Sequence, residues 1–244
     1  MRRMRLDKLL AQNGMSRSQA GQLIRAGRVR VDGEVVREAA HALDADAARV
    51  TLDGEPLSTE QHLHLMVHKP SGCLTATEDG RGPTVMDLLP EPLRRRGLGP
   101  VGRLDKDVTG LVLLTTDGQL AHRLISPRWK MDKRYVARVQ GRLDESCVRR
   151  FSEGVALRDF TCEPARLTIV QAGEEASLCE VVVHEGKYHQ VKRMLAACGH
   201  PVLELSRRSI AGIELDESLR PGEWRPLTEP ERARLYRLTE LEEK

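Results

Sequence analysis

The stretch PVGRLDKDVTGLVLLTTDG, from Pro100 to Gly118, contains the most informative pattern in the sequence. Its apolar run from Leu111 to Thr115 has the length and composition of a buried β-strand. Asp105 lies in a turn ahead of this run, with Arg103 two residues before it and Lys106 directly after it. A carboxylate in a tight loop, flanked by cations, suits a nucleophile or an anchor that acts on an anionic polymer. A purely structural Asp in a turn is the alternative.

The composition indicates a globular protein with an aliphatic core. The chain has 244 residues, enough for one large or two modest domains, and 40% of them are hydrophobic while only 3% are aromatic. The five cysteines lie far apart without a C-x-x-C pair, which favours buried thiols in a reducing compartment over a zinc ribbon or a redox site. The N-terminus is basic but lacks an apolar segment behind it, and no apolar run is long enough to span a membrane. We therefore expect a cytoplasmic protein without membrane association.

Positive charge is concentrated near the N-terminus. Residues 1–37 contain nine Lys and Arg side chains against three acidic ones, although the net charge of the whole chain is only +3. The remainder of the chain is therefore net negative. This asymmetry is typical of a nucleic-acid-binding module, with a solvated charged face as the alternative.

The first sixty residues are expected to form a small unit of two helices and a hairpin. The spacing of apolar residues predicts helices over 5–13 and 17–26, the second of them capped by Ser16. Alternation around an Asp-Gly pair predicts a hairpin over 29–36, and a further strand follows at 48–52. The string RLDKLLAQNGMSRSQAGQLIRAGRVRVDGEVV resembles the alpha-L RNA-binding module first recognised in a ribosomal small-subunit protein. That resemblance implies RNA contacts from the basic residues of the second helix and its exit: Arg17, Arg25, Arg28 and Arg30.

The rest of the chain predicts an α+β domain. A polar, turn-like segment over 56–62 suggests a boundary, so we expect one domain over residues 1–58 and a second over 63–244. Strands are expected within 63–68 and at 111–115, 132–143, 165–170, 177–184, 202–205 and 208–215. Helices are expected at 84–89, 119–127, 146–152, 188–198 and 229–241, with a connector at 90–99 and a turn in PGEWRPLT. Because the helices are interspersed irregularly, the pattern favours a mixed, mostly antiparallel sheet over a repeating βαβ fold.

Three histidines share one parity on the strand that follows the boundary, namely His62, His64 and His68. They could suggest a metal site. No carboxylate or Cys accompanies them at ligand spacing, so half-exposed strand residues are the better interpretation. We expect no metal.

Three separated strings, taken in order, carry a resemblance to a known family. They are GRLD with Asp105, K-x-Y with Lys133 and Tyr135, and EGKYHQVKRM over 185–194. The K-x-Y string alone is uninformative, but the ordered set is similar to the three active-site motifs of the bacterial rRNA pseudouridine synthases. The resemblance extends from His64 to Thr228.

This resemblance implies a role for several residues. Asp105 corresponds to the catalytic nucleophile, Tyr135 to the aromatic that stacks on the flipped-out uridine, and Lys192 to the cation that faces the carboxylate. Further RNA contacts are implied for the remaining polar residues of the motifs: Arg103, Lys133, His189, Gln190 and Arg193. Because the isomerisation neither adds nor removes a group, no cofactor is expected, and no Walker or dinucleotide-binding pattern occurs.

Other interpretations of the same residues exist. Tyr135 could be an ordinary core aromatic, and Lys192 with Arg193 could form a solvated helix face. Asp107 could suggest a glycosidase-like pair with Asp105, but two acids at i and i+2 of one loop rarely converge on one bond.

The third motif and the ending LRPGEWRPLTEPE resemble the small-subunit type, because large-subunit members tend to carry an Asn-Arg pair in that motif. The implied substrate is uridine 516 of 16S rRNA, modified by a monomer. Alternatives are an enzyme for 23S rRNA and a non-catalytic ribosome-assembly factor. Free rRNA and an assembly intermediate both remain possible substrates, Asp105 could attack C6 of the base or C1′ of the sugar, and the start could be Met1 or Met4.

Overall fold

The structure, a computed structural model, describes residues 2–80 and 82–243, so Met1, one of the two candidate start residues, lies outside it. The described residues form two compact units. Unit 1 contains residues 2–63 and Leu89–Leu98, and unit 2 contains His64–Leu88 and Gly99–Glu243. Among the described residues, none of the helices combines the length and the apolar character that crossing a membrane requires.

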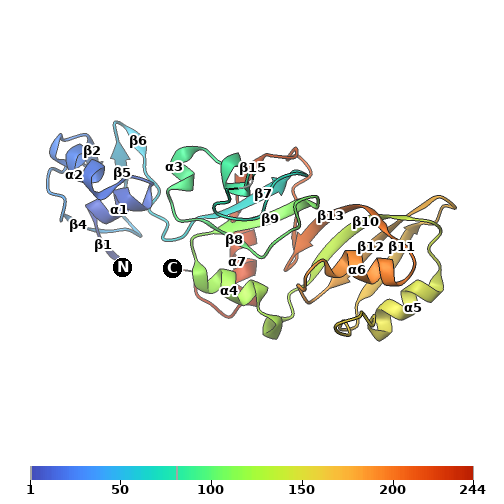
Figure 1. The fold of residues 1–244 in the computed structure, drawn as a ribbon. Helices are drawn as coiled ribbons and strands as arrows, with labels where there is room; N and C mark the ends of the chain where they lie inside the picture. The colour runs from blue at the N-terminus through green and yellow to red at the C-terminus, as the bar shows by residue number, and fades with distance from the viewer. Residues whose placement is uncertain (1, 81, 244) are drawn as a thin grey trace. The chain divides into compact units, whose positions relative to one another are not determined.

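Unit 1 combines short helices with two small sheets (Figure 1). Its helices are α1 (Leu6–Gln12), α2 (Arg17–Arg25) and α3 (Glu91–Arg94). Its strands are β1 (Arg3–Arg5), β2 (Val29–Val31), β3 (Glu34–Val35), β4 (Ala42–Asp44), β5 (Val50–Leu52) and β6 (Glu55–Pro56). Strand β1 pairs with β4, and the other four form a sheet in the order β3-β2-β5-β6.

Local sequence signals explain most of unit 1. Ser16 begins α2 with a capping box, since its Oγ accepts from the Gln19 N–H while the Gln19 side chain accepts from the Ser16 N–H. Asp32 and Gly33 have φ angles of 50° and 90°, as a type I′ hairpin turn requires. The expected helices and hairpin are therefore confirmed, whereas the β1–β4 pair was not anticipated, because its strands are only three residues long.

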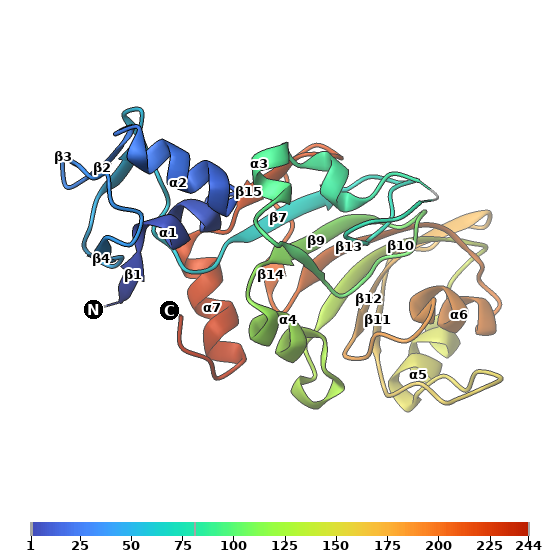
Figure 2. The ribbon, with the colours of Figure 1, turned by 60° about the vertical axis from the view of Figure 1, so that its left-hand side comes forward.

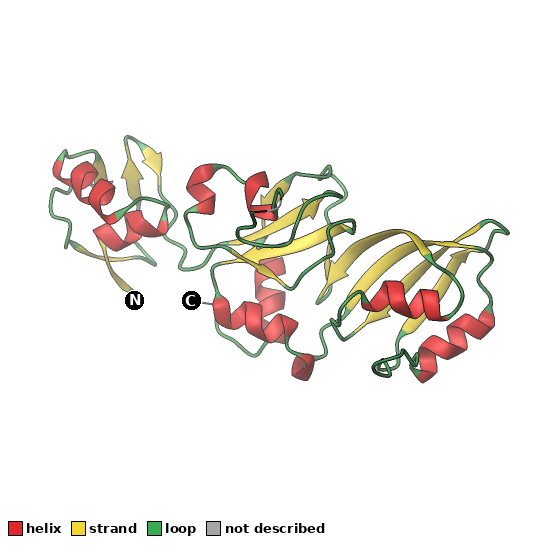
Figure 3. Cartoon of the chain, in the orientation of Figure 1, coloured by secondary structure: helices red, strands yellow, loops and turns green. Residues whose placement is uncertain are grey.

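Unit 2 is built on one large mixed sheet with helices beside it (Figure 3). Its strands are β7 (His64–Lys69), β8 (Gly99–Val101), β9 (Thr109–Thr115), β10 (Lys133–Gln140), β11 (Arg166–Gln171), β12 (Ala176–Val183), β13 (Val202–Ile210), β14 (Ile213–Glu214) and β15 (Trp224–Pro226). Its helices are η1 (Val85–Leu88), α4 (Gly118–Ile125), η2 (Pro127–Trp129), α5 (Glu145–Glu153), α6 (Gln190–Ala197) and α7 (Glu229–Leu238), of which η1 and η2 are 3₁₀ turns. In both ribbon views α5 and α6 lie beside the β11–β12 part of the sheet, and α4 and α7 beside the β8–β9 part (Figures 1 and 2).

The strand order is β11-β12-β10-β13-β9-β7-β15, with β14 and β8 attached to β13 and β9. Among the described residues, the β9–β13 pair is parallel and the other pairs are antiparallel, which confirms the expected α+β fold with a mixed, mostly antiparallel sheet. The parallel pair joins the two halves of the sheet through Gly110, which lies opposite Arg207. Gly110 has φ 105°, and a Cβ there would overlap the backbone of Arg207, so the close approach of the strands requires glycine.

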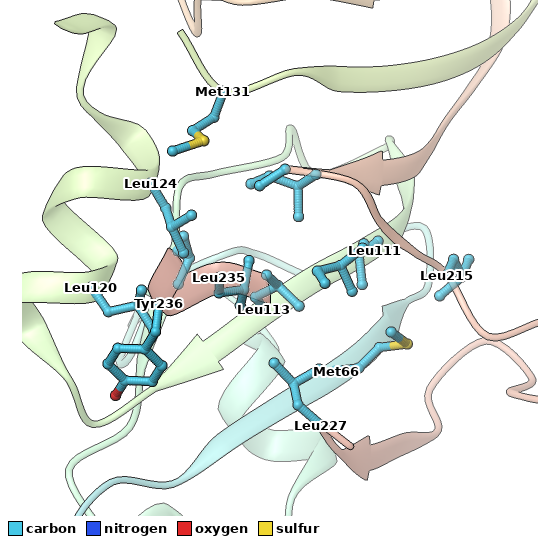
Figure 4. Packing of buried hydrophobic residues seen from close by; sticks show 14 residues of the cluster. Met66, Leu111, Leu113, Leu120, Leu124, Met131, Leu215, Leu227, Leu235 and Tyr236 are labelled. Carbon is cyan, nitrogen blue, oxygen red and sulfur yellow. The ribbon is translucent and has the colours of Figure 1, made fainter. Parts of the chain in front are cut away.

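An aliphatic cluster packs under the β7–β9 half of the sheet (Figure 4). Leu111 and Leu113 from β9, Leu120 and Leu124 from α4, and Leu235 from α7 are all buried there. Tyr236 is the one aromatic of the fully buried set, which agrees with the low aromatic content. Its hydroxyl donates to Asp117 at 2.8 Å.

Several boundaries differ from the sequence prediction. The two strands expected at 202–205 and 208–215 are instead one long strand, β13, followed by the short β14, because the polar residues Ser206 and Arg207 pair within the sheet. The helix expected from Tyr188 begins only at Gln190, because His189 has φ 50° and is not helical. The segments expected to be a turn and a connector contain β15 and α3.

The interpretation of His64 as half-exposed is wrong. Its side chain is buried, and its imidazole nitrogens lie 2.8 Å from Thr115 Oγ1 and 3.3 Å from the Tyr236 hydroxyl. His68 is partly buried, and its Nδ1 lies 2.8 Å from the Leu219 carbonyl oxygen. Both rings therefore make hydrogen bonds that link β7 to neighbouring segments.

Candidate active site

Asp105 lies in the loop between β8 and β9, and two buried side chains hold that loop in place. The Lys69 ammonium donates to the carbonyl oxygens of Lys106 at 3.0 Å and Val108 at 2.7 Å, and Lys69 is fully buried. The Thr75 hydroxyl both donates to the Leu104 carbonyl at 3.0 Å and accepts from the Leu104 N–H at 3.1 Å. Because the backbone on both sides of Asp105 is anchored, its carboxylate has a defined position.

Two side chains from the third motif reach the Asp105 carboxylate. Lys192 Nζ lies 3.2 Å from Oδ2, and His189 Nε2 lies 3.4 Å from Oδ1. Lys192 comes from the first turns of α6, and His189 precedes that helix in the left-handed conformation. The structure thus brings together the first and third motifs, as the resemblance implied.

Lys192 is shared with a second carboxylate. Its Nζ lies 2.7 and 2.9 Å from the two oxygens of Asp107, closer than to Asp105. The hydrogen bond from Lys192 is the main cause that holds the pKa of Asp107 below its usual value. Burial opposes the charged form of Lys192, but its bonds to Asp107 and Asp105 outweigh it and raise the pKa of Lys192. The ammonium therefore stays charged beside both carboxylates.

Tyr135 completes the constellation from the second motif. It lies on β10, is 9% exposed, and lines the same pocket as Asp105, His189 and Lys192. This pocket has a volume of about 340 Å³. Hollows of about 540 and 520 Å³ also exist, one in unit 1 and one in unit 2 that Lys192 and Asp107 line, but neither contains Asp105 or Tyr135. The chemistry of the lining, and not the volume, identifies the candidate site.

Lys133 and Arg103 also line the pocket, in different ways. Lys133 is buried, and its ammonium donates to the carbonyl oxygens of Met131 at 3.0 Å and His184 at 3.2 Å. Burial, followed by the charge of Arg207, lowers the pKa of Lys133 to about 8. Arg103 by contrast is exposed, so a group outside the pocket can reach it.

Two of the predicted contact residues make structural contacts around α6. Gln190 is buried, and its amide donates to Glu185 Oε2 at 2.9 Å and accepts from the Lys187 N–H at 3.1 Å. Arg193 pairs with Asp159, and its guanidinium lies 5.2 Å from the centre of the Phe160 ring. Gln190 lines the pocket, whereas the structure does not bring Arg193 among the residues that line it.

The four arginines predicted to contact RNA lie in unit 1, and all are exposed: Arg17, Arg25, Arg28 and Arg30. The Arg28 guanidinium pairs with Asp53, and Arg30 donates to the Gly33 carbonyl at 2.9 Å. Arg37 donates to the carbonyl of Arg25 at 2.9 Å and so ties the end of α2 to the hairpin.

Sequence reasoning missed three residues of the site. Lys69 and Arg207 are buried cations on strands, where a charged residue is ordinarily interpreted as exposed. Tyr188 was assigned to the expected helix and given no role. In the structure it is 76% exposed and stacks on His189, with a distance of 3.8 Å between the ring centres. In a chain with only three tyrosines, each one could have been considered as a base-stacking residue.

Comparisons with known proteins agree with this geometry. The family model described as RNA pseudouridylate synthase matches residues 63–197, and the S4 domain model matches residues 4–48. Ribosomal small subunit pseudouridine synthase A of Escherichia coli is 45% identical over 93% of this chain and 98% of its own length. An uncharacterised RNA pseudouridine synthase of Bacillus subtilis is 42% identical over 93% of this chain and 96% of its own length.

A solved structure of a pseudouridylate synthase is similar over 95% of this chain and 99% of its own, with a TM-score of 0.67 and 38% identity. The family match covers more than half of the chain, and the two named relatives match it nearly from end to end. This protein, with an S4 domain at its N-terminus, therefore belongs to the RNA pseudouridine synthases, which are isomerases.

Proposed function

We propose that the chain converts uridine to pseudouridine in small-subunit rRNA, with Asp105 as the nucleophile. The observation that carries this proposal is the convergence of three distant motifs on one pocket, where Asp105, Tyr135 and Lys192 all line the wall. Asp107 is the less suitable acid, because its side chain is 71% exposed and lines a different hollow, which does not contain Tyr135.

Each residue has a task in this reaction. Asp105 attacks the uridine, at C6 of the base or at C1′ of the sugar, and the bond between N1 and C1′ breaks before the base rejoins through C5. Lys192 places a positive charge 3.2 Å from the Asp105 carboxylate and 2.7 Å from that of Asp107. Tyr135 stacks on the base, which must leave the RNA stack to enter the pocket, at a cost of a few kcal/mol.

The RNA contacts divide between the two parts of the chain. Residues 1–58 act as an RNA-binding domain through exposed arginines, and residues 63–244 act as the catalytic domain. Arg103 is placed to contact a phosphate near the flipped nucleotide or to fill the gap that the base leaves, and His189 is a further candidate for base contact. The enzyme works as a monomer in the cytoplasm and needs no cofactor.

Small-subunit rRNA is favoured by the Escherichia coli relative, whose name assigns it to the ribosomal small subunit, and by the resemblance of the third motif. We propose uridine 516 of 16S rRNA as the target. The decisive experiment incubates the purified protein with 16S rRNA, 23S rRNA and a 30S assembly intermediate and maps pseudouridine at nucleotide resolution. Modification of the single 16S position is expected. Modification of 23S rRNA alone would redirect the assignment to the large subunit, and absence of pseudouridine from all three would contradict the proposal.

A further inference from the structure

The candidate pocket contains a buried cation, Arg207, to which the proposed reaction assigns no role. Arg207 on β13 is only 1% exposed, yet it lines the pocket together with Asp105 and Tyr135. Its Nε donates to the Leu111 carbonyl at 2.9 Å. Its Nη2 is buried and has no hydrogen-bond partner within the described part of the chain. A guanidinium is a planar cation that presents several N–H donors in a fixed fork.

The backbone holds this cation next to the proposed stacking residue. Arg207 and Tyr135 are direct partners in the β10–β13 ladder, so their side chains are neighbours on one face of the sheet. On its other side Arg207 is opposite Gly110, where a Cβ would overlap the Arg207 backbone. The backbone of Arg207 is therefore fixed between two strands, beside the residue on which the base would stack.

The charge of Arg207 acts on Lys133, which also lines the pocket. After burial, it is the next cause that lowers the pKa of Lys133. The Lys133 ammonium already donates to two backbone carbonyls, whereas Nη2 of Arg207 lacks an acceptor. Buried polar groups are nearly always hydrogen-bonded, so an orphan donor in a pocket wall indicates a missing acceptor.

We propose that the Arg207 guanidinium donates a hydrogen bond to a carbonyl oxygen of the flipped uracil and stabilises the negative charge that the base acquires. This inference rests on the proposed function. It holds for both routes of attack by Asp105. Attack at C6 forms an O–C6 bond, and the C5–C6 π electrons move to O4 as an enolate. Attack at C1′ forms an O–C1′ bond and breaks C1′–N1, and the electron pair is delocalised from N1 to O2 and O4. In either case the charge reaches an oxygen of the base.

The depth of Arg207 favours the base over a backbone phosphate as its ligand. The exposed cations Arg103 and Lys187 also line the pocket and can meet phosphates without entering it. Arg207 is nearly inaccessible, and the part of a nucleotide that enters furthest into such a pocket is the extruded base. A donor fixed in advance at the site of developing charge typically contributes about 100-fold to 1000-fold in rate.

The test compares Arg207→Met with Arg208→Met in single-turnover assays on saturating RNA. Arg208 is the next residue on the same strand and pairs with Glu217 at 3.4 Å, so its variant is a matched control outside the pocket. We expect Arg207→Met to lower the rate about 100-fold to 1000-fold with little change in RNA affinity, and Arg208→Met to retain nearly the wild-type rate. Arg207→Lys should recover part of the loss, because it restores a charge but not the fork of donors.

RNA with 5-fluorouridine at the target provides a readout that a structural role would not affect. The electron-withdrawing fluorine stabilises negative charge on the base by itself, so the ratio of wild-type to Arg207→Met rates for the first step should shrink. An unchanged ratio would overturn the charge-stabilising role. If Arg207→Met does not fold, Arg207→Lys is compared with Arg207→Gln. The rate should then be higher for Arg207→Lys, which keeps the positive charge, than for Arg207→Gln, which does not.

Two further outcomes separate the inference from the proposed function. A weaker RNA affinity with an unchanged single-turnover rate would assign Arg207 to a phosphate and contradict the inference alone. Equal rates for Arg207→Met and wild type would also contradict the inference. The proposed function would still stand in that case, provided that the wild type forms pseudouridine. Failure of the wild type to modify any RNA would instead remove the proposed function itself.

Discussion

The arginines at the second helix of unit 1 and the buried cations of the pocket region in unit 2 differ in exposure and therefore in the ligands they can reach. The unit 1 arginines Arg17, Arg25, Arg28 and Arg30 are exposed to solvent. In the pocket region Lys69, Lys133 and Arg207 are buried, and their nitrogens donate mainly to backbone carbonyls. Salt weakens the attraction between an exposed cation and a phosphate, whereas it weakens the interactions of a buried cation much less. We infer that affinity for RNA should depend on salt through unit 1, while the chemical step should not.

The largest effect is expected at Asp105. Asp105→Asn removes the proposed nucleophile while preserving shape and polarity, so pseudouridine formation should fall by about a thousandfold or more with RNA affinity nearly unchanged. Asp107→Asn is the matched control, because Asp107 is the neighbouring acid and shares Lys192. The measurement is single-turnover pseudouridine formation. Residual turnover of Asp105→Asn within tenfold of wild type would refute the assignment.

The next effect concerns the stacking residue. Tyr135→Ala should lose about tenfold to a hundredfold in activity, because base–aromatic stacking contributes roughly 1–3 kcal/mol per base. Tyr135→Phe should keep RNA binding, and a loss of rate in that variant would assign the hydroxyl to a proton transfer. Equal activity of Tyr135→Ala and wild type would make Tyr135 an ordinary core aromatic.

Lys192→Met should change the pH dependence more than the maximal rate. A carboxylate that loses a neighbouring cation holds its proton more tightly, and Lys192 Nζ lies 3.2 Å from the carboxylate of Asp105, the proposed nucleophile. Since the reaction needs an ionised carboxylate, the acidic limb of the pH–rate profile should move to higher pH, and activity should be lost first at low pH. A profile that coincides with that of the wild type would mean that another cation takes this role.

Charge reversal in unit 1 should weaken RNA binding and leave the rate of the chemical step nearly unchanged. Reversal of Arg17, Arg25 and Arg28 together, or removal of residues 1–58, should raise the KM for rRNA and flatten its dependence on salt. Turnover on saturating RNA should survive better than affinity. Activity against salt concentration is measured for the wild type, the triple variant and the truncated protein. If the three curves coincide, the basic residues of unit 1 form only a solvated surface and do not bind the RNA. The proposed difference between the cations of the two units would then be wrong.

The smallest effect is expected at Tyr188. Its exposed ring stacks on His189, which contacts Asp105, so its free face is available to a base next to the flipped nucleotide. Tyr188→Ala should raise KM by about tenfold or less, and Tyr188→Phe should not. Because the side chain is exposed, both variants should fold normally, and unchanged thermal melting is the control. A KM equal to that of the wild type in Tyr188→Ala would exclude an RNA contact.

Much of this protein follows from local sequence. The hairpin turns at Asp32 and Gly33, the cap at Ser16 and the alternating strand that contains Tyr135 are decided by residues near one another, since propensity, capping and periodicity act over a few positions. The family resemblance adds the order of the three motifs, and the comparisons confirm the family. Asp105, Tyr135 and Lys192 could therefore be nominated from the sequence.

Other features depend on contacts between distant segments. The sharing of Lys192 between Asp105 and Asp107 arises only where α6 meets the loop before β9. The burial of Arg207 and Lys69 was not predicted, because a charged residue inside a strand is ordinarily exposed. Their burial is possible only where distant segments supply carbonyl acceptors, β9 for Arg207 and the loop before β9 for Lys69. The sequence by itself determined most of the elements, indicated the family and nominated the candidate reactive residues. Only the tertiary structure decided which cations are buried, because burial and hydrogen bonding are set by segments that the chain brings together from far apart.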